Sequence, residues 1–300
     1  MRKGAAADTA PGPSYYSALL RSPFADALTL DFARAAVAGE QLGRDDAPDI
    51  LAISLSGHDY VNHQWSAESR LSHDHLLHLD RLLEAFFRDL DATVGRDNYI
   101  AVLTADHGFM PAPETSLAQG LDAGRLSSTQ LLNRVNTDLE RRFGVAKLVA
   151  FPSASGLVLD RKLLAERRLD AAAVADAARE AVLGEPAIGA AYTRAELETG
   201  SRAGAPFFNA MRRSWHRDVS GDVQFVLKPY WMFGSSTNIA THGSPHGYDT
   251  HVPILFWGPN WVKAGPVAAR IETIDIAPTL AGVLGVPAPP ANEGRRLTLR

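Results

Sequence analysis

Aspartate and histidine occur together at three separate places in this chain of 300 residues. Asp59 and His63 are four residues apart, Asp106 and His107 are adjacent, and several histidines fall within residues 241–251. Carboxylate oxygens and imidazole nitrogens are ligands that suit Zn²⁺. Because the three places lie far apart in the chain, a metal centre built from them needs a fold that brings them together.

Apolar runs beside these places predict buried strands. One run covers residues 49–56, a second covers residues 99–103, and a third covers residues 252–257. In an α/β sheet, ligands and metals collect at the carboxyl ends of the strands. The three runs are therefore expected to bring the aspartates and histidines to one edge of a sheet.

The local spacing supports the same interpretation. If a helical turn follows the first run, Asp59 and His63 point the same way and can bind one cation together. Gly108 follows the second pair directly, so the backbone there can turn sharply and closely approach whatever the pair holds.

Four short phrases carry a resemblance to a known family: DYVNH at 59–63, TADHG at 104–108, THGSP at 241–245 and YDTHVP at 248–253. Together they resemble the alkaline phosphatase superfamily of two-metal phosphoryl and sulfuryl hydrolases. They look most like the secreted bacterial phosphate-irrepressible alkaline phosphatases, which are close relatives of the type I phosphodiesterase and nucleotide pyrophosphatase branch. The likeness covers most of residues 15–297 and keeps the ligand motifs in the family's order.

The resemblance implies a two-zinc site. One Zn²⁺ would be held by Asp59, His63 and His242, and the other by Asp106 and His107. Two metal ions about 3.5–4 Å apart stabilise both the attacking and the leaving oxygen of an in-line displacement at phosphorus.

The third ligand of the first metal is the least determined, because His246 and His251 lie close to His242. His242 occupies the Thr-His-Gly position of the family phrase, whereas the position of His246 is more often aromatic in relatives. The resemblance therefore favours His242 and leaves the other two histidines open.

The same resemblance implies two parts that residues 1–48 do not supply. The family's second metal takes one further aspartate, and a nucleophilic Thr or Ser sits beside it, both in an N-terminal portion. Asp8 and Thr9 are the only nearby acid–hydroxyl pair, and no predicted strand holds them. We therefore predict no catalytic residue in this chain and expect it to be the C-terminal part of such an enzyme.

The implied function is a metal-dependent phosphoric ester hydrolase of the alkaline phosphatase type, acting on phosphomonoesters. A phosphodiesterase or nucleotide pyrophosphatase is the first alternative, because all branches share these ligands. The second is a catalytically inactive metal-binding fragment, which the missing nucleophile favours for the chain as given. Small phosphate esters are the expected partners. The family is usually periplasmic or secreted, although this chain carries no recognisable export signal.

The amino-acid composition gives no support to several other classes of protein. With 46% hydrophobic residues the chain can bury a sizeable core. A net charge of −4 gives no electrostatic reason to expect nucleic acid as a partner. No apolar run reaches the ~18–20 residues that a membrane span needs, and the absence of cysteine excludes disulfides and thiolate metal ligands.

The predicted fold is α/β, an alkaline-phosphatase-like three-layer sandwich with a mostly parallel central sheet. Residues 15–300 would form this domain, with an inserted α+β subdomain at about 112–235, and residues 1–14 would be a disordered start. Apolar periodicity predicts helices at 22–42, 66–94, 128–143, 170–183 and 275–284. Further strands are expected at 155–160, 188–192, 222–233 and 267–271, with Trp231 packed inside a hairpin in the third of these.

Three histidines lie on the long helix predicted at 66–94, namely His73, His75 and His78. Leucines at three- and four-residue spacing already set the buried face of that helix. These histidines are therefore expected to be solvated or only partly packed.

Overall fold

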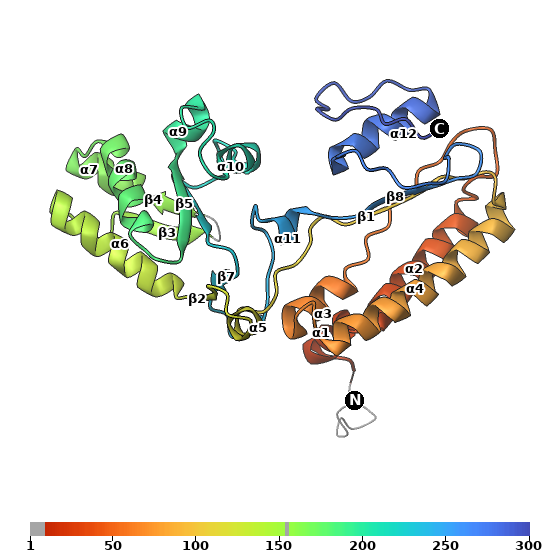
Figure 1. Cartoon of the computed structure of the whole chain (residues 1–300), viewed down its shortest axis with the longest axis horizontal. Helices are drawn as coiled ribbons and strands as arrows, with labels where there is room; N and C mark the ends of the chain where they lie inside the picture. The colour runs from red at the N-terminus through yellow and green to blue at the C-terminus, as the bar shows by residue number, and fades with distance from the viewer. Residues whose placement is uncertain (1–9, 154–155) are drawn as a thin grey trace. The chain divides into compact units, whose positions relative to one another are not determined.

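The computed structural model describes residues 10–153 and 156–300, so Asp8 and Thr9 and most of the expected disordered start lie outside the described residues. The chain divides into two compact units (Figure 1). Unit 1 comprises Met1–Asp106 and Val252–Arg300, and unit 2 comprises His107–His251.

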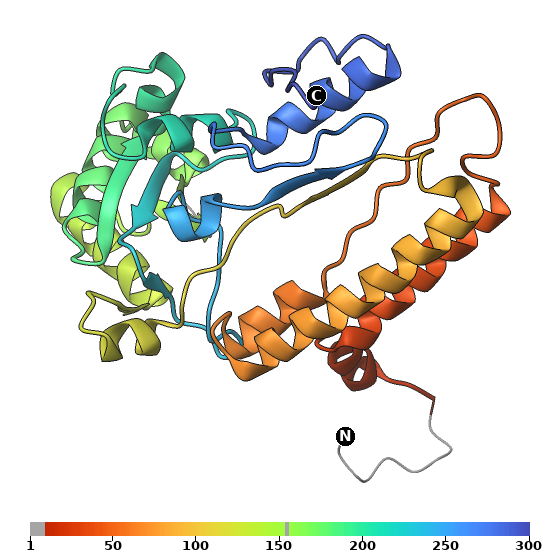
Figure 2. The ribbon, with the colours of Figure 1, turned by 45° about the vertical axis from the view of Figure 1, so that its right-hand side comes forward.

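Two long helices form the base of unit 1. Helix α2 (Pro23–Gly39) starts with a proline, and α4 (Arg70–Leu90) starts at Ser69, whose hydroxyl accepts the Ser72 N–H at 3.0 Å. Figure 2 shows the two helices side by side, with the short α1 (Pro13–Leu20) at one end of α2. Their shared core is built around Leu30 and Phe86.

Both long helices are shorter than the periodicity predicts. α2 ends at Gly39 rather than at residue 42, and α4 begins only at Arg70 because residues 66–69 form a cap and turn. A π-helical turn, Asp91–Gly95, then ends the helix at the expected glycine. His75 is wrong as a solvated or partly packed residue: its side chain is only 2% exposed.

Only part of the expected ligand-bearing sheet forms in unit 1. Strand β1 (Ala101–Thr104) pairs antiparallel with β8 (Ile254–Trp257), so both strands form where they are expected. They are not buried as predicted, because Leu103 and Leu255 are 44% and 56% exposed. Residues 49–56 form neither helix nor strand and lead directly into α3 (Gly57–Trp65). Among the described strands, residues 49–56 therefore do not join β1 and β8 in the common sheet that the sequence predicts.

The last helix of unit 1 ends where it is expected to end. A 3₁₀ turn, Thr273–Asp275, leads into α12 (Ile276–Leu284), and Gly285 ends the helix in the left-handed region at φ +71°. The edge strand expected at residues 267–271 does not form, and this segment is exposed coil for most of its length.

Unit 2 is built on a four-stranded antiparallel sheet in the order β3-β4-β6-β5. The strands are β3 (Val149–Ser153), β4 (Gly156–Leu159), β6 (Val223–Leu227) and β5 (Ile188–Thr193). The helices are α6 (Ser128–Phe143), α7 (Arg161–Arg167), α8 (Ala171–Leu183), α9 (Arg194–Thr199) and α10 (Phe208–Ser214). Buried Leu139, Val174 and Leu157 tie α6, α8 and β4 into one core.

The helices of unit 2 begin where the sequence places polar caps. Ser127 accepts the Gln130 N–H at the start of α6, and Asp170 accepts the Ala172 N–H at the start of α8. Both helices agree with their predicted ranges to within one residue.

The hairpin expected within residues 222–233 is wrong. β6 lies in the four-stranded sheet, whereas β7 (Trp231–Phe233) pairs in parallel with β2 (Gly124–Leu126). Trp231 does pack against the core, and its indole N–H donates to Asp122 at 3.0 Å. Two short helices complete the unit, α5 (Pro113–Ala118) and α11 (Gly247–Thr250).

The architecture is α/β, as predicted, with small sheets in the described residues. Among those residues, no helix is long and apolar enough to cross a membrane.

Candidate metal centre

Helix α3 carries Asp59 and His63 on one face, as their spacing predicts. His63 Nε2 lies 3.6 Å from Asp59 Oδ2, and the two side chains are 19% and 31% exposed, respectively. Val61, on the opposite side of the same helix, and Asn62 are buried. α3 therefore presents a carboxylate and an imidazole next to each other, partly sheltered and still accessible.

The start of α3 is held by a buried carboxylate from α2. Asp26 Oδ1 accepts the Gly57 N–H at 3.0 Å, and Asp26 Oδ2 lies 3.3 Å from His75 Nε2 on α4. Asp26 is 1% exposed. Burial, the largest effect, raises the pKa of Asp26, while the Gly57 hydrogen bond and the charge of His75 act in the opposite direction. One side chain of α2 thus contacts both the start of α3 and α4.

His58, the residue before Asp59 in the chain, lies next to His75. Its ring centroid lies 5.3 Å from that of His75. Burial and the neighbouring His75 lower the pKa of His58 to about 4, so the ring is neutral at pH 7. Burial likewise lowers the pKa of His75.

Within unit 2, His107 and His242 lie against each other. Their ring centroids are 3.4 Å apart and the ring planes differ by 6°. Two backbone hydrogen bonds align their segments: Gly108 N–H donates to the Asp249 carbonyl at 2.7 Å, and Met110 N–H donates to the Thr241 carbonyl at 3.2 Å. The second and third sequence motifs are therefore neighbours in space.

Gly108 is required by a close approach, although not to a ligand. A Cβ placed there would lie 2.1 Å from the Tyr248 carbonyl oxygen. That distance is far below a van der Waals contact, so any other residue would separate the two segments. The glycine thus brings the His107 segment against residues 241–249.

Asp249 is a buried residue of this region whose role the sequence motifs alone do not reveal. It is 3% exposed, and its Oδ2 accepts both the backbone N–H and the hydroxyl of Ser244, at 2.8 and 2.6 Å. Burial raises its pKa, and the Ser244 bonds together with nearby His242 and His107 oppose that rise. Asp249 therefore fixes the turn that follows His242. Its position in the YDTHVP phrase was the available signal.

The three candidate histidines of residues 241–251 differ in their surroundings. His246 is 6% exposed, and its Nε2 lies 2.8 Å from the Leu227 carbonyl oxygen, so it packs inside unit 2. His251 is exposed at the end of α11. His242 is half-buried and stacks on His107. Asp106, the acidic member of the second pair, is exposed two residues after β1.

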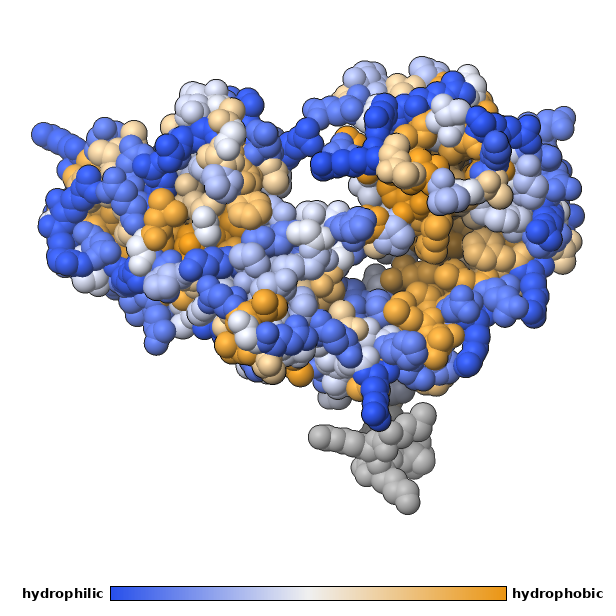
Figure 3. Space-filling model, in the orientation of Figure 1, coloured by the Kyte–Doolittle hydropathy of each residue, from blue (hydrophilic) through white to orange (hydrophobic). Residues whose placement is uncertain are grey.

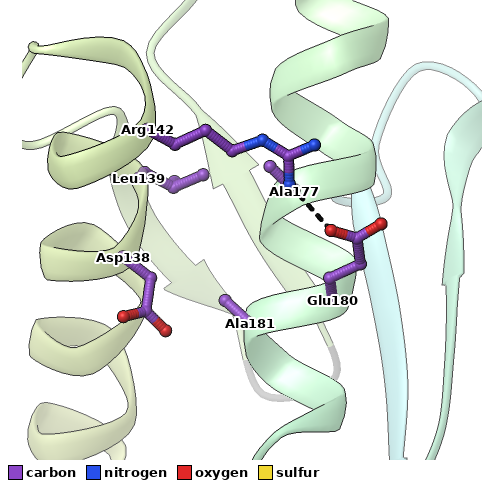
Figure 4. A pocket seen from close by; sticks show the side chains of 6 residues that line it. All are labelled: Asp138, Leu139, Arg142, Ala177, Glu180 and Ala181. Carbon is purple, nitrogen blue, oxygen red and sulfur yellow. Dashed lines mark hydrogen bonds and ion pairs between the residues drawn. The ribbon is translucent and has the colours of Figure 1, made fainter.

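A surface hollow in unit 2 lies apart from these residues in the sequence and on different elements. Figure 4 shows it between α6 and α8, where Arg142 donates to Glu180 at 2.7 Å across a floor of Leu139, Ala177 and Ala181. None of the predicted ligands lines it. It is the groove of a packed helix pair.

The sequence of this chain matches the family model described as type I phosphodiesterase / nucleotide pyrophosphatase over residues 9–249. The match includes all three ligand motifs. The chain belongs to this family. It is thereby placed in the alkaline phosphatase superfamily, as the motifs predict.

Individual relatives agree with that placement. The alkaline phosphatase PafA of Elizabethkingia meningoseptica is 31% identical over 278 residues, which cover 92% of this chain and 50% of the relative. The alkaline phosphatase PhoK of a Sphingomonas species is 34% identical, with 95% of this chain and 52% of the relative covered. A crystal structure of wild-type PafA superposes with a TM-score of 0.87 at 30% identity, covering 94% of this chain and 54% of that one. The chain thus spans about half the length of the relatives it matches.

Proposed function

We propose that this chain carries the metal-ligand part of a metal-dependent phosphoric ester hydrolase of the alkaline phosphatase type. The observation that carries the proposal is the Asp59–His63 pair, two donors 3.6 Å apart on one face of α3, at the position of the family's first ligand motif. The family match and the alkaline phosphatase names of the relatives support the reaction class.

In this proposal one Zn²⁺ is held by Asp59, His63 and His242, and a second by Asp106 and His107. The stacked rings of His107 and His242 support it, because the imidazoles assigned to the two different ions are immediate neighbours within unit 2. His246 is less suited as a ligand, since its Nε2 already faces a backbone carbonyl. A donor set of carboxylates and imidazoles without thiolates fits zinc.

Zinc in such a site would supply positive charge to the oxygens of a phosphoryl group. The residues of this chain prepare the ligands for that task. Asp26 holds the first turn of α3 through the Gly57 N–H, and Asp249 holds the turn after His242 through Ser244. Preorganised ligands of this kind lose little conformational entropy when the ion binds.

The proposed substrates are small phosphomonoesters, in keeping with the names of the relatives. Phosphodiester hydrolysis is the second candidate, favoured by the name of the family model. We assign no catalytic nucleophile to this chain. Because it spans half of its relatives, metal binding without turnover is the expected behaviour of the chain alone. We further propose a periplasmic or secreted location for the whole protein, and an inserted subdomain at about residues 112–235.

The test measures zinc content and hydrolysis of p-nitrophenyl phosphate at mildly alkaline pH on the full chain. The variant is Asp59→Ala with His63→Ala. The matched control is Asp74→Ala with His78→Ala, another Asp–His pair four residues apart in the sequence. Asp74 Oδ2 and His78 Nε2 are 3.8 Å apart, and both side chains are exposed on α4. The chain and the control should retain their zinc, and the variant should lose the ion assigned to Asp59, His63 and His242. Equal zinc in all three proteins would contradict the proposal.

The hydrolysis arm separates the candidates. Turnover by the chain and the control, but not by the variant, would show that a nucleophile works within these residues and would overturn our assignment of none. A preference for bis(p-nitrophenyl) phosphate over the monoester would favour the phosphodiesterase. Zinc binding without turnover is the outcome expected from the proposal.

A further inference from the structure

Two segments of unit 2 carry histidines of the candidate metal centre without any helix or strand to hold them. Residues 107–112 lead into α5 and include His107, and residues 234–246 lead from β7 to α11 and include His242. Backbone hydrogen bonds from Gly108 and Met110 join the two segments. Because no secondary structure fixes either segment, side-chain contacts have to add to these bonds.

Arg125, on β2, contacts both segments at once. Its Nε and Nη2 donate to the two carboxylate oxygens of Glu114 at 2.7 and 2.9 Å. Its Nη2 also donates to the Ile239 carbonyl at 2.7 Å, and its Nη1 donates to the Asn238 carbonyl at 3.4 Å. One guanidinium group is thus bonded to a carboxylate and to two backbone carbonyls.

The acceptors of Arg125 belong to the two segments that carry the histidines. Glu114 lies in the first turn of α5, seven residues after His107, and Ile239 lies three residues before His242. Figure 1 shows α5 beside β2 and β7, and β7 leads directly into the second segment. Arg125 therefore joins the chain that follows His107 to the chain that precedes His242.

The contact between Arg125 and Glu114 differs from an ordinary surface ion pair. Figure 3 shows hydrophilic residues over much of the visible face of unit 2, and most exposed ion pairs contribute little to stability. The Arg125 side chain is only 27% exposed, and its fork meets both carboxylate oxygens. The hydrogen bond from Arg125 is the largest effect on the pKa of Glu114, which is lowered, so the carboxylate is charged at neutral pH.

We propose that Arg125 is a positioning residue of the candidate metal centre, which holds the two histidine segments together and thereby keeps the His107 and His242 rings stacked. The ring centroids are 3.4 Å apart, so a small separation of the segments would end the stacking. The consequence for zinc affinity rests on the proposed function. The arrangement of the metal-free segments does not.

The test uses the full chain and compares Arg125→Ala with Arg134→Ala. Arg134 is the matched control because it also contacts a glutamate and a backbone carbonyl within unit 2, Glu185 at 2.8 Å and Ala181 at 3.4 Å. These contacts lie around α6 and α8 and touch neither histidine segment. A general loss of stability in unit 2 should therefore affect both variants, whereas a loss of positioning should affect only Arg125→Ala.

Two readouts on metal-free protein follow the histidine segments directly. The Gly108 and Met110 amides bond across the two segments, so their hydrogen exchange should be at least about tenfold faster in Arg125→Ala and unchanged in the control. In protein that contains isotope-labelled histidine, the ring NMR signals of His107 and His242 should move toward those of an unstacked imidazole. The same signals should stay in place in the control.

Two further variants test the geometry of the contact. Lysine keeps the charge but lacks the planar fork, so Arg125→Lys should resemble Arg125→Ala in both readouts. Glu114→Ala removes a side chain that is 62% exposed and should move the same signals. Its effect on exchange should not add to that of Arg125→Ala, because both substitutions break one contact. If Arg125→Ala does not fold, exchange in Glu114→Ala decides the question.

Zinc affinity is measured last, by competition against a chelator. Arg125→Ala should weaken the site that includes His242 by about tenfold, and the control should not change it. A parent chain that binds no zinc would count against the proposed function and leave the two metal-free readouts to test Arg125.

Four results would overturn the proposal. The first is unchanged exchange and unchanged histidine signals in Arg125→Ala, and the second is an equal change in Arg134→Ala. The third is full recovery of both readouts in Arg125→Lys. The fourth is a zinc-binding parent whose zinc affinity is the same in Arg125→Ala.

Discussion

Asp26→Ala should destabilise unit 1 strongly although it removes only one carboxylate. The substitution leaves the Gly57 N–H, bonded at 3.0 Å, without its acceptor and removes the oxygen 3.3 Å from His75 Nε2. Each polar group left buried and unpaired costs about 1–3 kcal/mol. Only the Gly57 N–H loses a hydrogen bond, because His75 Nε2 has none among the described residues, so we expect a loss of about 1–3 kcal/mol in the free energy of unfolding around a residue that is 1% exposed.

Native-state hydrogen exchange is the assay, because it reports on α3 and α4 without mixing in unit 2. Their amides should exchange faster in Asp26→Ala by the factor that corresponds to the lost free energy. Asp26→Asn, which retains an acceptor for Gly57, should recover most of the protection. Asp31→Ala on the same helix, where the side chain is 70% exposed, should change stability by less than about 0.5 kcal/mol. Equal exchange in Asp26→Ala and Asp31→Ala would refute the argument.

Three further perturbations have defined outcomes. Leu30→Ala, which empties a fully buried position of α2, should cost about 2–5 kcal/mol by urea unfolding, while exposed Leu28→Ala should cost far less; equal losses would contradict the assigned core. Gly108→Ala should speed amide exchange in residues 241–249, whereas Gly247→Ala, with open space around its Cα, should not. The lowered pKa of His58 stabilises the metal-free fold above pH 6.5, and this contribution to stability is lost as the pH falls through about 4. The stability advantage of the parent over His58→Gln should therefore shrink between pH 6.5 and about 4 when unfolding is measured as a function of pH. A difference in stability that stays constant over this interval would contradict the prediction.

The sequence was sufficient for features that depend on local rules. Ser127 and Asp170 cap α6 and α8, and both helices agree with prediction because periodicity and cap point to the same start. The placement of Asp59 and His63 on one helical face is confirmed for the same reason, since it needs only the 3.6-residue period.

Features that depend on distant partners were not predictable from the same patterns. Residues 49–56 have the composition of a buried strand, but strands form by pairing, and no described residue pairs with them. β7 pairs with β2 rather than with β6, its neighbour in the sequence. The three-layer sandwich and mostly parallel sheet therefore stay predictions for the whole protein.

Buried polar groups were the least visible in the sequence. His75 lies four residues before Leu79 and seven before Leu82, which places it on the apolar face of the helix, whereas His73 and His78 lie away from that face. The periodicity does not reveal its partner, Asp26, which is almost fifty positions away and meets His75 only in the folded unit. Asp249 was visible as part of a phrase, but its role depends on the Ser244 contacts.

The central claim is that Asp59, His63 and His242 bind one zinc ion together, and competition for zinc against a chromogenic chelator tests it most directly. The measurement compares the parent chain with His242→Ala and with His251→Ala, an exposed histidine nine residues further along. We predict that His242→Ala weakens the tighter zinc site by more than about tenfold and that His251→Ala leaves it unchanged. Unchanged affinity in His242→Ala, or an equal loss in His251→Ala, would contradict the assignment.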